Sequence, residues 1–170
     1  WPGGLGRPDR HYNPKGADAK RADPRAKDQV HVEKMLALAG DKAAAANGKA
    51  IVELETELAK VQWSRVEKRD PVKSYNKVEL AKLAELAPGF DWDAMFKSAG
   101  IPQKDGMRKV IVAENTAFPK LAKVFAATPV EVWRDYMTTR YLHRSAAFLP
   151  KRVADTAFAI YGTALGGQTA

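Results

Sequence analysis

The chain has 170 residues, of which 45% are hydrophobic and 28% charged, and this balance is typical of a globular domain with one sizeable core. No apolar run reaches the length of about 18 residues that a membrane-spanning helix requires, which argues against an integral membrane protein. The absence of cysteine excludes disulfide bonds, thiolate-bound zinc, iron–sulfur clusters and a cysteine nucleophile. Because the first residue is Trp1 and not methionine, we expect a segment of a longer polypeptide.

Basic residues outnumber acidic residues by 28 to 20, which gives a formal charge of +8. The excess is spread evenly along the chain, and stretches such as residues 53–70 mix both signs. Mixed signs are typical of a solvated helical surface, whereas a nucleic-acid site gathers positive charge on one face. The charge pattern therefore disfavours nucleic-acid binding.

The predicted elements are mainly helical. Residues 1–24, rich in glycine and proline, predict an extended leading segment, and residues 25–170 form the predicted helical domain. Apolar spacing and capping patterns predict helices over residues 24–39, 43–64, 76–86, 92–99, 118–127, 129–147 and 151–161. Residues 110–112 predict a short strand, whose partner is a weaker strand here, another copy, or a segment outside this sequence. The expected class is mainly α, a multi-helix domain with at most one or two short β-strands.

Local motifs predict how the middle of the chain turns. Asp70 and Pro71 predict a turn that ends the second helix, because proline moves its preceding residue out of the helical region. Tyr75 and Asn76 follow this turn, and Asn76 with Glu79 has the spacing of a capping box. We interpret these residues as fold residues.

A second candidate capping box, Thr128 with Glu131, predicts the start of the helix over residues 129–147, with Pro129 at its first position. Arg140 and Arg144 share one side of this helix with a run of apolar residues: Val130, Trp133, Met137 and Tyr141. Either the arginine stems cover the core while their heads reach water, or the two arginines pair with carboxylates of an absent partner domain.

Motifs for self-contained catalysis are missing from the sequence. The three histidines, His11, His31 and His143, have no spacing for a local zinc site, and no His-Glu-x-x-His run is present. On their predicted helices, His31 and His143 are expected to be surface or semi-buried. Nearby carboxylates such as Glu55 and Glu57 point to different helix faces and are expected to be surface groups. No nucleophile elbow, phosphate-binding loop or dinucleotide turn occurs, so this chain alone is not expected to be an enzyme.

Several short motifs occur in an order that resembles a known family. They are Gly4 to Tyr12, Arg69-Asp70-Pro71, Tyr75-Asn76-Lys77, Ala87 to Trp92, Leu142 to Leu149 and Tyr161-Gly162-Thr163. Together they resemble the neprilysin and endothelin-converting-enzyme family of zinc metallopeptidases, in particular its bacterial members. The resemblance covers the chain from about Leu5 to Gln168 and places it in the middle of the family's helical, lid-type lobe.

The resemblance implies a function for the whole enzyme and a supporting role for this chain. The helical lobe encloses a substrate chamber that limits access to oligopeptides, while zinc and every catalytic residue belong to a catalytic lobe of the same polypeptide. No catalytic or metal-binding residue is therefore expected here, and Arg140 and Arg144 are the candidates for the chamber or the contact between lobes. The resemblance also implies a periplasmic, cell-envelope or secreted location.

Two other functions stay open at this point. One is a stand-alone basic helical module that binds acidic peptides or nucleic acid through its positive charge. The other is a structural fragment that self-associates through a face normally buried against the catalytic lobe.

Overall fold

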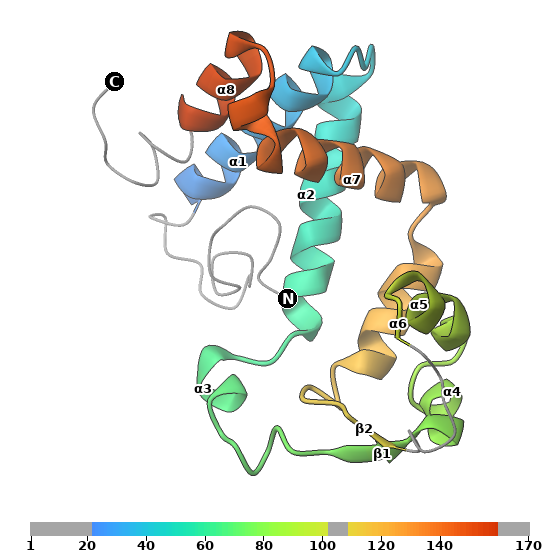
Figure 1. Cartoon of the computed structure of the whole chain (residues 1–170). Helices are drawn as coiled ribbons and strands as arrows, with labels where there is room; N and C mark the ends of the chain where they lie inside the picture. The colour runs from blue at the N-terminus through green and yellow to red at the C-terminus, as the bar shows by residue number, and fades with distance from the viewer. Residues whose placement is uncertain (1–21, 102–108, 160–170) are drawn as a thin grey trace. The chain divides into compact units, whose positions relative to one another are not determined.

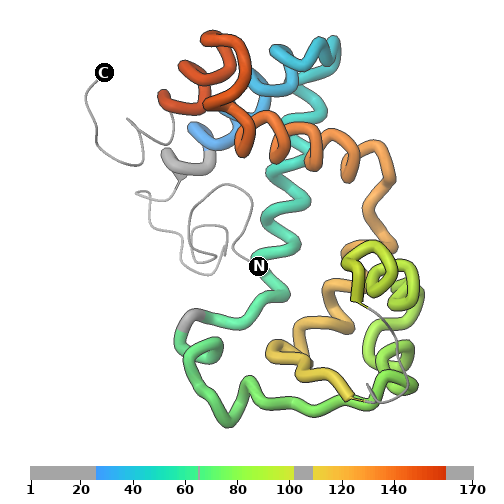
Figure 2. Tube along the Cα trace, in the orientation of Figure 1, coloured from blue at the N-terminus to red at the C-terminus, as the bar shows by residue number. Residues whose placement is uncertain are grey.

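The computed structural model describes residues 22–101 and 109–159, which belong to two compact units. Unit 1 takes its residues from both ends of the chain, up to Lys60 and from Thr128 onward, and unit 2 is Val61–Ala127. Figures 1 and 2 show the course of the chain through both units. Within the described segments, no helix combines the length and the apolar character that crossing a bilayer requires.

Unit 1 is built from helices. They are α1 (Ala22–Leu38), α2 (Ala44–Val61), α7 (Val130–Arg144), the 3₁₀-helix η4 (Ala146–Phe148) and α8 (Lys151–Phe158). Helices α1, α7 and α8 contact one another, although α1 is far from the other two in sequence (Figure 1). Their shared core consists of Met35, Ala146, Val153 and Ala157, with Leu38, Leu142 and Leu149 packed against it.

Unit 2 combines short helices with a two-stranded sheet. Its elements are α3 (Arg65–Lys68), β1 (Lys77–Glu79), the 3₁₀-helix η3 (Leu80–Lys82), α4 (Leu83–Leu86), α5 (Trp92–Ser98), β2 (Lys109–Ile111) and α6 (Phe118–Ala127). The buried core of the unit is Leu83, Phe96 and Val112, and the half-buried Trp92 and Phe118 pack against it. The two strands pair antiparallel, with Val78 opposite Val110.

The predicted class, mainly α with two short strands, is confirmed. Gly40 ends α1 at a φ of 90°, a left-handed conformation that glycine adopts without strain. Asp91 caps α5, because its Oδ1 accepts a hydrogen bond from the Ala94 N–H at 2.9 Å. The predicted leading segment lies outside the described residues as far as residue 21, and so does the end of the last predicted helix. Residues 22–24 were predicted to be extended but form the first turn of α1.

The helix predicted to start at Asn76 was wrong in its first turn. Residues 77–79 instead form β1, the partner that the sequence left open for the strand predicted at 110–112. Asn76 caps no helix there: its carbonyl accepts from the Val112 N–H at 2.9 Å, and its Nδ2 donates to the Lys73 carbonyl at 2.8 Å. Pairing with a distant strand, together with burial of Val78 against the core, outweighs the local capping preference.

The start of α7 also differs from its prediction by one residue. Pro129, and not Thr128, occupies the N-cap with an extended backbone (φ −57°, ψ 145°) and no side-chain cap hydrogen bond. Thr128 is therefore not the N-cap residue that the predicted capping box requires. Glu131 still lies in the first turn, where negative charge stabilises a helix. At its other end α7 stops at Arg144, and residues up to Phe148 continue as η4.

A close approach between α1 and α2 gives the first testable prediction. A Cβ on Gly48 would lie 2.6 Å from Glu33 Cγ and 3.3 Å from the Glu33 backbone nitrogen. In an unhindered helix, Gly48→Ala would stabilise by about 1 kcal/mol, but overpacking costs about 1–3 kcal/mol. We therefore expect Gly48→Ala to lower the free energy of unfolding, as measured by urea denaturation. The control Ala46→Gly, at an exposed position of α2, reports helix propensity alone, and a stabilised Gly48→Ala variant would contradict the close approach.

Candidate functional site

Helix α7 carries the two arginines that the sequence singled out, but its apolar stripe is not its buried side. Tyr136 and Thr139 are the buried residues of α7. Val130, Met137 and Tyr141, which the sequence placed on the apolar side, are 71%, 53% and 67% exposed. The helix thus packs with the face that carries Tyr136 and leaves the apolar face that carries these three residues in solvent.

The two arginines differ in their surroundings. Arg140 is half-buried, and its positive charge is one cause, after burial, of the lowered pKa of His143. Arg144 lies exposed in the last turn of α7, where a positive charge complements the helix dipole. The structure therefore does not place the two guanidinium groups in one buried site.

His31 of α1 and His143 of α7 form an edge-to-face pair, with ring centroids 5.9 Å apart and ring planes at 83°. His31 is 4% exposed, so the expectation of a surface or semi-buried histidine was wrong for it, whereas His143 is half-buried. The pKa of His31 is lowered to about 4, and the largest cause is burial. The charges of His143 and Lys34 also lower this pKa, whereas a hydrogen bond with the Thr156 backbone raises it. The pair is consequently neutral near pH 7.

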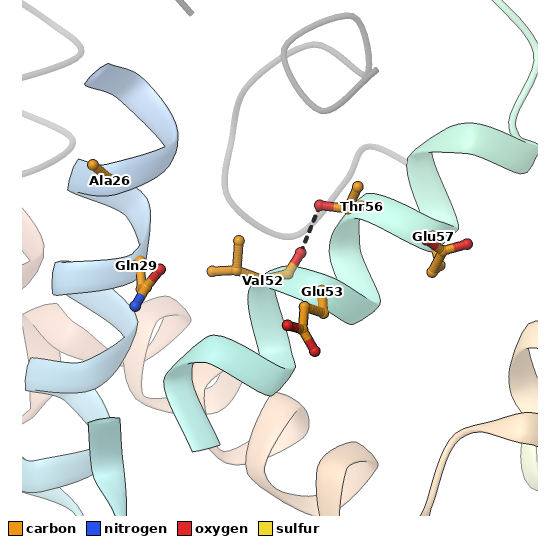
Figure 3. A pocket seen from close by; sticks show the side chains of 6 residues that line it. All are labelled: Ala26, Gln29, Val52, Glu53, Thr56 and Glu57. Carbon is orange, nitrogen blue, oxygen red and sulfur yellow. Dashed lines mark hydrogen bonds between the residues drawn. The ribbon is translucent and has the colours of Figure 1, made fainter. Parts of the chain in front are cut away.

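Figure 3 shows an open cleft between α1 and α2. Its lining is Ala26 and Gln29 from α1 and Val52, Glu53, Thr56 and Glu57 from α2. Thr56 Oγ1 donates to the Val52 carbonyl of its own helix at 2.8 Å, so this hydroxyl is held along α2. The lining includes carboxylates but no lysine or arginine, and it offers no nucleophile paired with a base.

Metal binding finds no support in the described residues. Across residues 22–101 and 109–159, no three histidine or carboxylate side chains are grouped so that they could hold a metal ion. The side chains described here therefore do not fit the zinc that the resemblance assigns to the catalytic lobe.

Unit 2 contains a network around Trp63 that the sequence motifs did not indicate. The Trp63 N–H donates to Glu114 Oε2 at 3.1 Å, and its indole Nε1 donates to Thr116 Oγ1 at 2.7 Å. Lys68 pairs with Glu114 at 3.1 Å, and Lys73 Nζ lies 5.0 Å from the Trp63 ring centroid. The network joins two loops that are far apart in sequence.

The motif residues beside this network have structural roles. Asp70 Oδ1 accepts from the N–H groups of Val72 and Lys73 at 2.9 and 3.0 Å, so the turn predicted at Asp70 and Pro71 is present. The prediction that this turn ends the second helix was wrong, because α2 already ends at Val61 and α3 lies between them. Tyr75 is 56% exposed and has the Lys77 ammonium 5.4 Å from its ring centroid. None of these side chains is arranged as an acid–base pair.

Glu55 is a residue whose environment the sequence did not indicate. It was expected on the surface of the second helix, yet it is 2% exposed and lies on the buried side of α2 beside Leu54 and Leu58. Its one-residue offset from the apolar stripe of α2 is the signal that could have placed it there.

The arrangement matches solved zinc metalloproteases. The structure of zinc metalloprotease Zmp1 from Mycobacterium tuberculosis in its open state has a TM-score of 0.87 and 27% identity, covering 98% of this chain and 26% of that one. The inhibitor complex of the same protease has a TM-score of 0.83 and 28% identity, covering 98% and 25%. The fold is thus that of one segment of a zinc metalloprotease.

The family follows from the sequence match. A model of the N-terminal region of peptidase family M13 matches residues 1–170, and the chain belongs to this family. Endothelin-converting enzyme 1 of Cavia porcellus is 26% identical over 154 residues, which cover 89% of this chain and 20% of the relative. The human enzyme of the same name is 25% identical over the same shares. The chain therefore spans about a fifth to a quarter of the length of these relatives.

Proposed function

We propose that this chain is part of the non-catalytic helical lobe of a neprilysin-like zinc metalloendopeptidase. In this role it helps to enclose the substrate chamber and limits access to oligopeptides, while a catalytic lobe of the same polypeptide binds zinc and hydrolyses the peptide bond. The observation that carries the proposal is the match of 98% of this chain to a zinc metalloprotease at a TM-score of 0.87.

Two further points belong to the proposal. The partners are the catalytic lobe and the oligopeptide substrates, and the location is the periplasm, the cell envelope or the extracellular space. The even spread of positive charge supports these partners over nucleic acid.

The container role can be tested with the longer polypeptide that includes this segment. The zinc-loaded enzyme is given two substrates. One is a fluorogenic oligopeptide, and the other is a folded carrier protein that has the same cleavage sequence in an exposed loop. A chamber closed by a helical lobe admits the peptide but not the carrier, so we expect kcat/KM to differ by at least about 100-fold, an effect of about 3 kcal/mol. Equal cleavage of both would contradict the container role, and peptide hydrolysis by the isolated 170-residue chain would contradict its non-catalytic role.

The two arginines remain candidates for the chamber or for the contact between lobes. In the same enzyme, we expect Arg140→Ala/Arg144→Ala to change KM for acidic and neutral peptides by the same small factor and to lower the melting temperature. The reason is that the half-buried Arg140 covers core atoms with its stem.

Steady-state kinetics on a matched pair of acidic and neutral peptides, with thermal unfolding, checks this prediction. Arg152→Ala, which removes an exposed arginine from α8, is the matched control. A rise in KM confined to acidic peptides would instead place the arginines in the chamber, because they would then bind substrate carboxylates.

A further inference from the structure

One side of α7 forms an exposed apolar face. Val130, Met137 and Tyr141, at positions i, i+7 and i+11, lie along one line of the helix and are all more than half exposed. We call these three residues the outer face of α7. None of its residues belongs to a described core cluster. The buried residues of α7, Tyr136 and Thr139, lie on another side of the helix.

The composition of the outer face is that of a protein interface. Methionine, tyrosine and arginine are enriched where proteins meet, and apolar centres are surrounded there by polar rims. On either side of the outer face stand the exposed side chains of Arg134 and Arg144. Arg134 Nε lies 3.9 Å from Asp135 Oδ1, and the Arg134 side chain is 73% exposed, so its charge is largely available to a partner.

Arg134 and Arg144, which we call the rim of the outer face, determine which partners can bind there. A second copy of this chain carries the same +8 charge and would bring another arginine rim against the first, which opposes association. Carboxylates on the partner would instead complement the rim. In the solved relative, about three quarters of the polypeptide lies outside the part that matches this chain, which leaves ample sequence for such a surface.

We propose that the outer face of α7 packs against an apolar, acidic-rimmed surface in the rest of the same polypeptide. This inference rests on the proposed function, in which the chain is one part of a longer peptidase. It assigns the outer face to an internal contact of the enzyme, and it removes this face from the walls of the substrate chamber.

Hydroxyl-radical footprinting tests the contact, because methionine and tyrosine side chains are both readily oxidised when exposed. The 170-residue chain and the longer polypeptide are oxidised under the same conditions, and the rates at Met137 and Tyr141 are read by mass spectrometry. We expect both rates to fall at least fivefold in the longer polypeptide. Unchanged rates in the longer polypeptide would overturn the inference. Protection that is already present in the 170-residue chain would also overturn it. If that protection depends on concentration, a second copy covers the face.

A pair of substitutions gives an independent measurement. In the longer polypeptide, Met137→Ser/Tyr141→Ser is expected to speed oxidation of the other residues of α7 and to lower the melting temperature. The control is Val72→Ser, which changes an 84% exposed residue of unit 2 and should lower the melting temperature less. Equal effects of the two variants would overturn the contact. Peptidase activity is assayed in parallel, so that an inactive wild-type polypeptide contradicts the proposed function while the footprint still decides the contact.

Discussion

Replacing His31 with glutamine is expected to remove much of the acid sensitivity of unit 1. The pKa of His31 is about 4 in the folded chain against 6.5 for the free side chain. As the pH falls from about 6.5 to about 4, the unfolded chain takes up a proton that the folded chain does not, so stability is lost over this window. A shift of this size corresponds to about 3 kcal/mol.

The surroundings of His31 explain why protonation is unfavourable there. The charges that act on His31 are those of His143 on α7 and Lys34 on α1. Arg140 acts on His143, the ring partner of His31. From α8, Asp155 lines the same groove as His31 and offers a carboxylate, but it is held by Lys151 at 2.6 Å. Asp28, one turn before His31 on α1, is also buried.

The loss of stability with falling pH is measured by urea denaturation at several pH values between 4 and 7. Hydrogen exchange of the α1 and α7 amides monitors the unfolding of unit 1. The wild-type chain should lose stability steeply below pH 6.5, and His31→Gln should lose less. Glu67→Gln is the matched control: hydrogen bonds from Lys73 and Ser64 lower the pKa of Glu67 to about 2. Its contribution is therefore lost only as the pH falls from about 4.5 to 2. Parallel curves for His31→Gln and wild type would rule out His31 as the cause.

Trp63→Ala is expected to destabilise unit 2 more than any surface substitution. Trp63 is 6% exposed, and removing a buried aromatic side chain costs about 3–5 kcal/mol. The substitution also removes the donor to Thr116 and the ring beneath the Lys73 ammonium. Because domains are stable by only about 5–15 kcal/mol, the midpoint of urea unfolding should fall sharply.

Two milder variants separate the contributions. Trp63→Phe keeps most of the buried area but loses the indole N–H, and leaving the Thr116 hydroxyl without its donor should cost about 1–2 kcal/mol. Thr116→Val removes the other partner, so a double-mutant cycle with Trp63→Phe isolates the hydrogen bond. Additive effects in this cycle would show that the 2.7 Å contact contributes nothing beyond packing.

Local signals predicted most of the helices because those helices have caps and apolar spacing that need no distant partner. The helices α5 and α6, predicted over residues 92–99 and 118–127, are of this kind. The residues around Asn76 failed because their conformation depends on pairing with β2, more than thirty residues away. A capping preference is a small local energy, and a distant strand can outweigh it.

The candidate site could be predicted less well than the fold. Apolar periodicity marks a stripe on α7, but it does not say whether the stripe faces the core or an external partner, and Val130 and Tyr141 prove to be exposed. Burial of His31 depends on α7 and α8, which come much later in the chain. The sequence motifs indicated the family, which the comparisons confirmed.

The division of the chain also sets an order of assembly. Unit 2 is one uninterrupted stretch, so all its contacts are available once Ala127 has left the ribosome. Helix α1 precedes unit 2 in the sequence but packs on α7 and α8, which follow unit 2. During synthesis the face of α1 that carries Met35 is therefore without its partners while unit 2 is already complete, and it is the surface that a chaperone would have to shield.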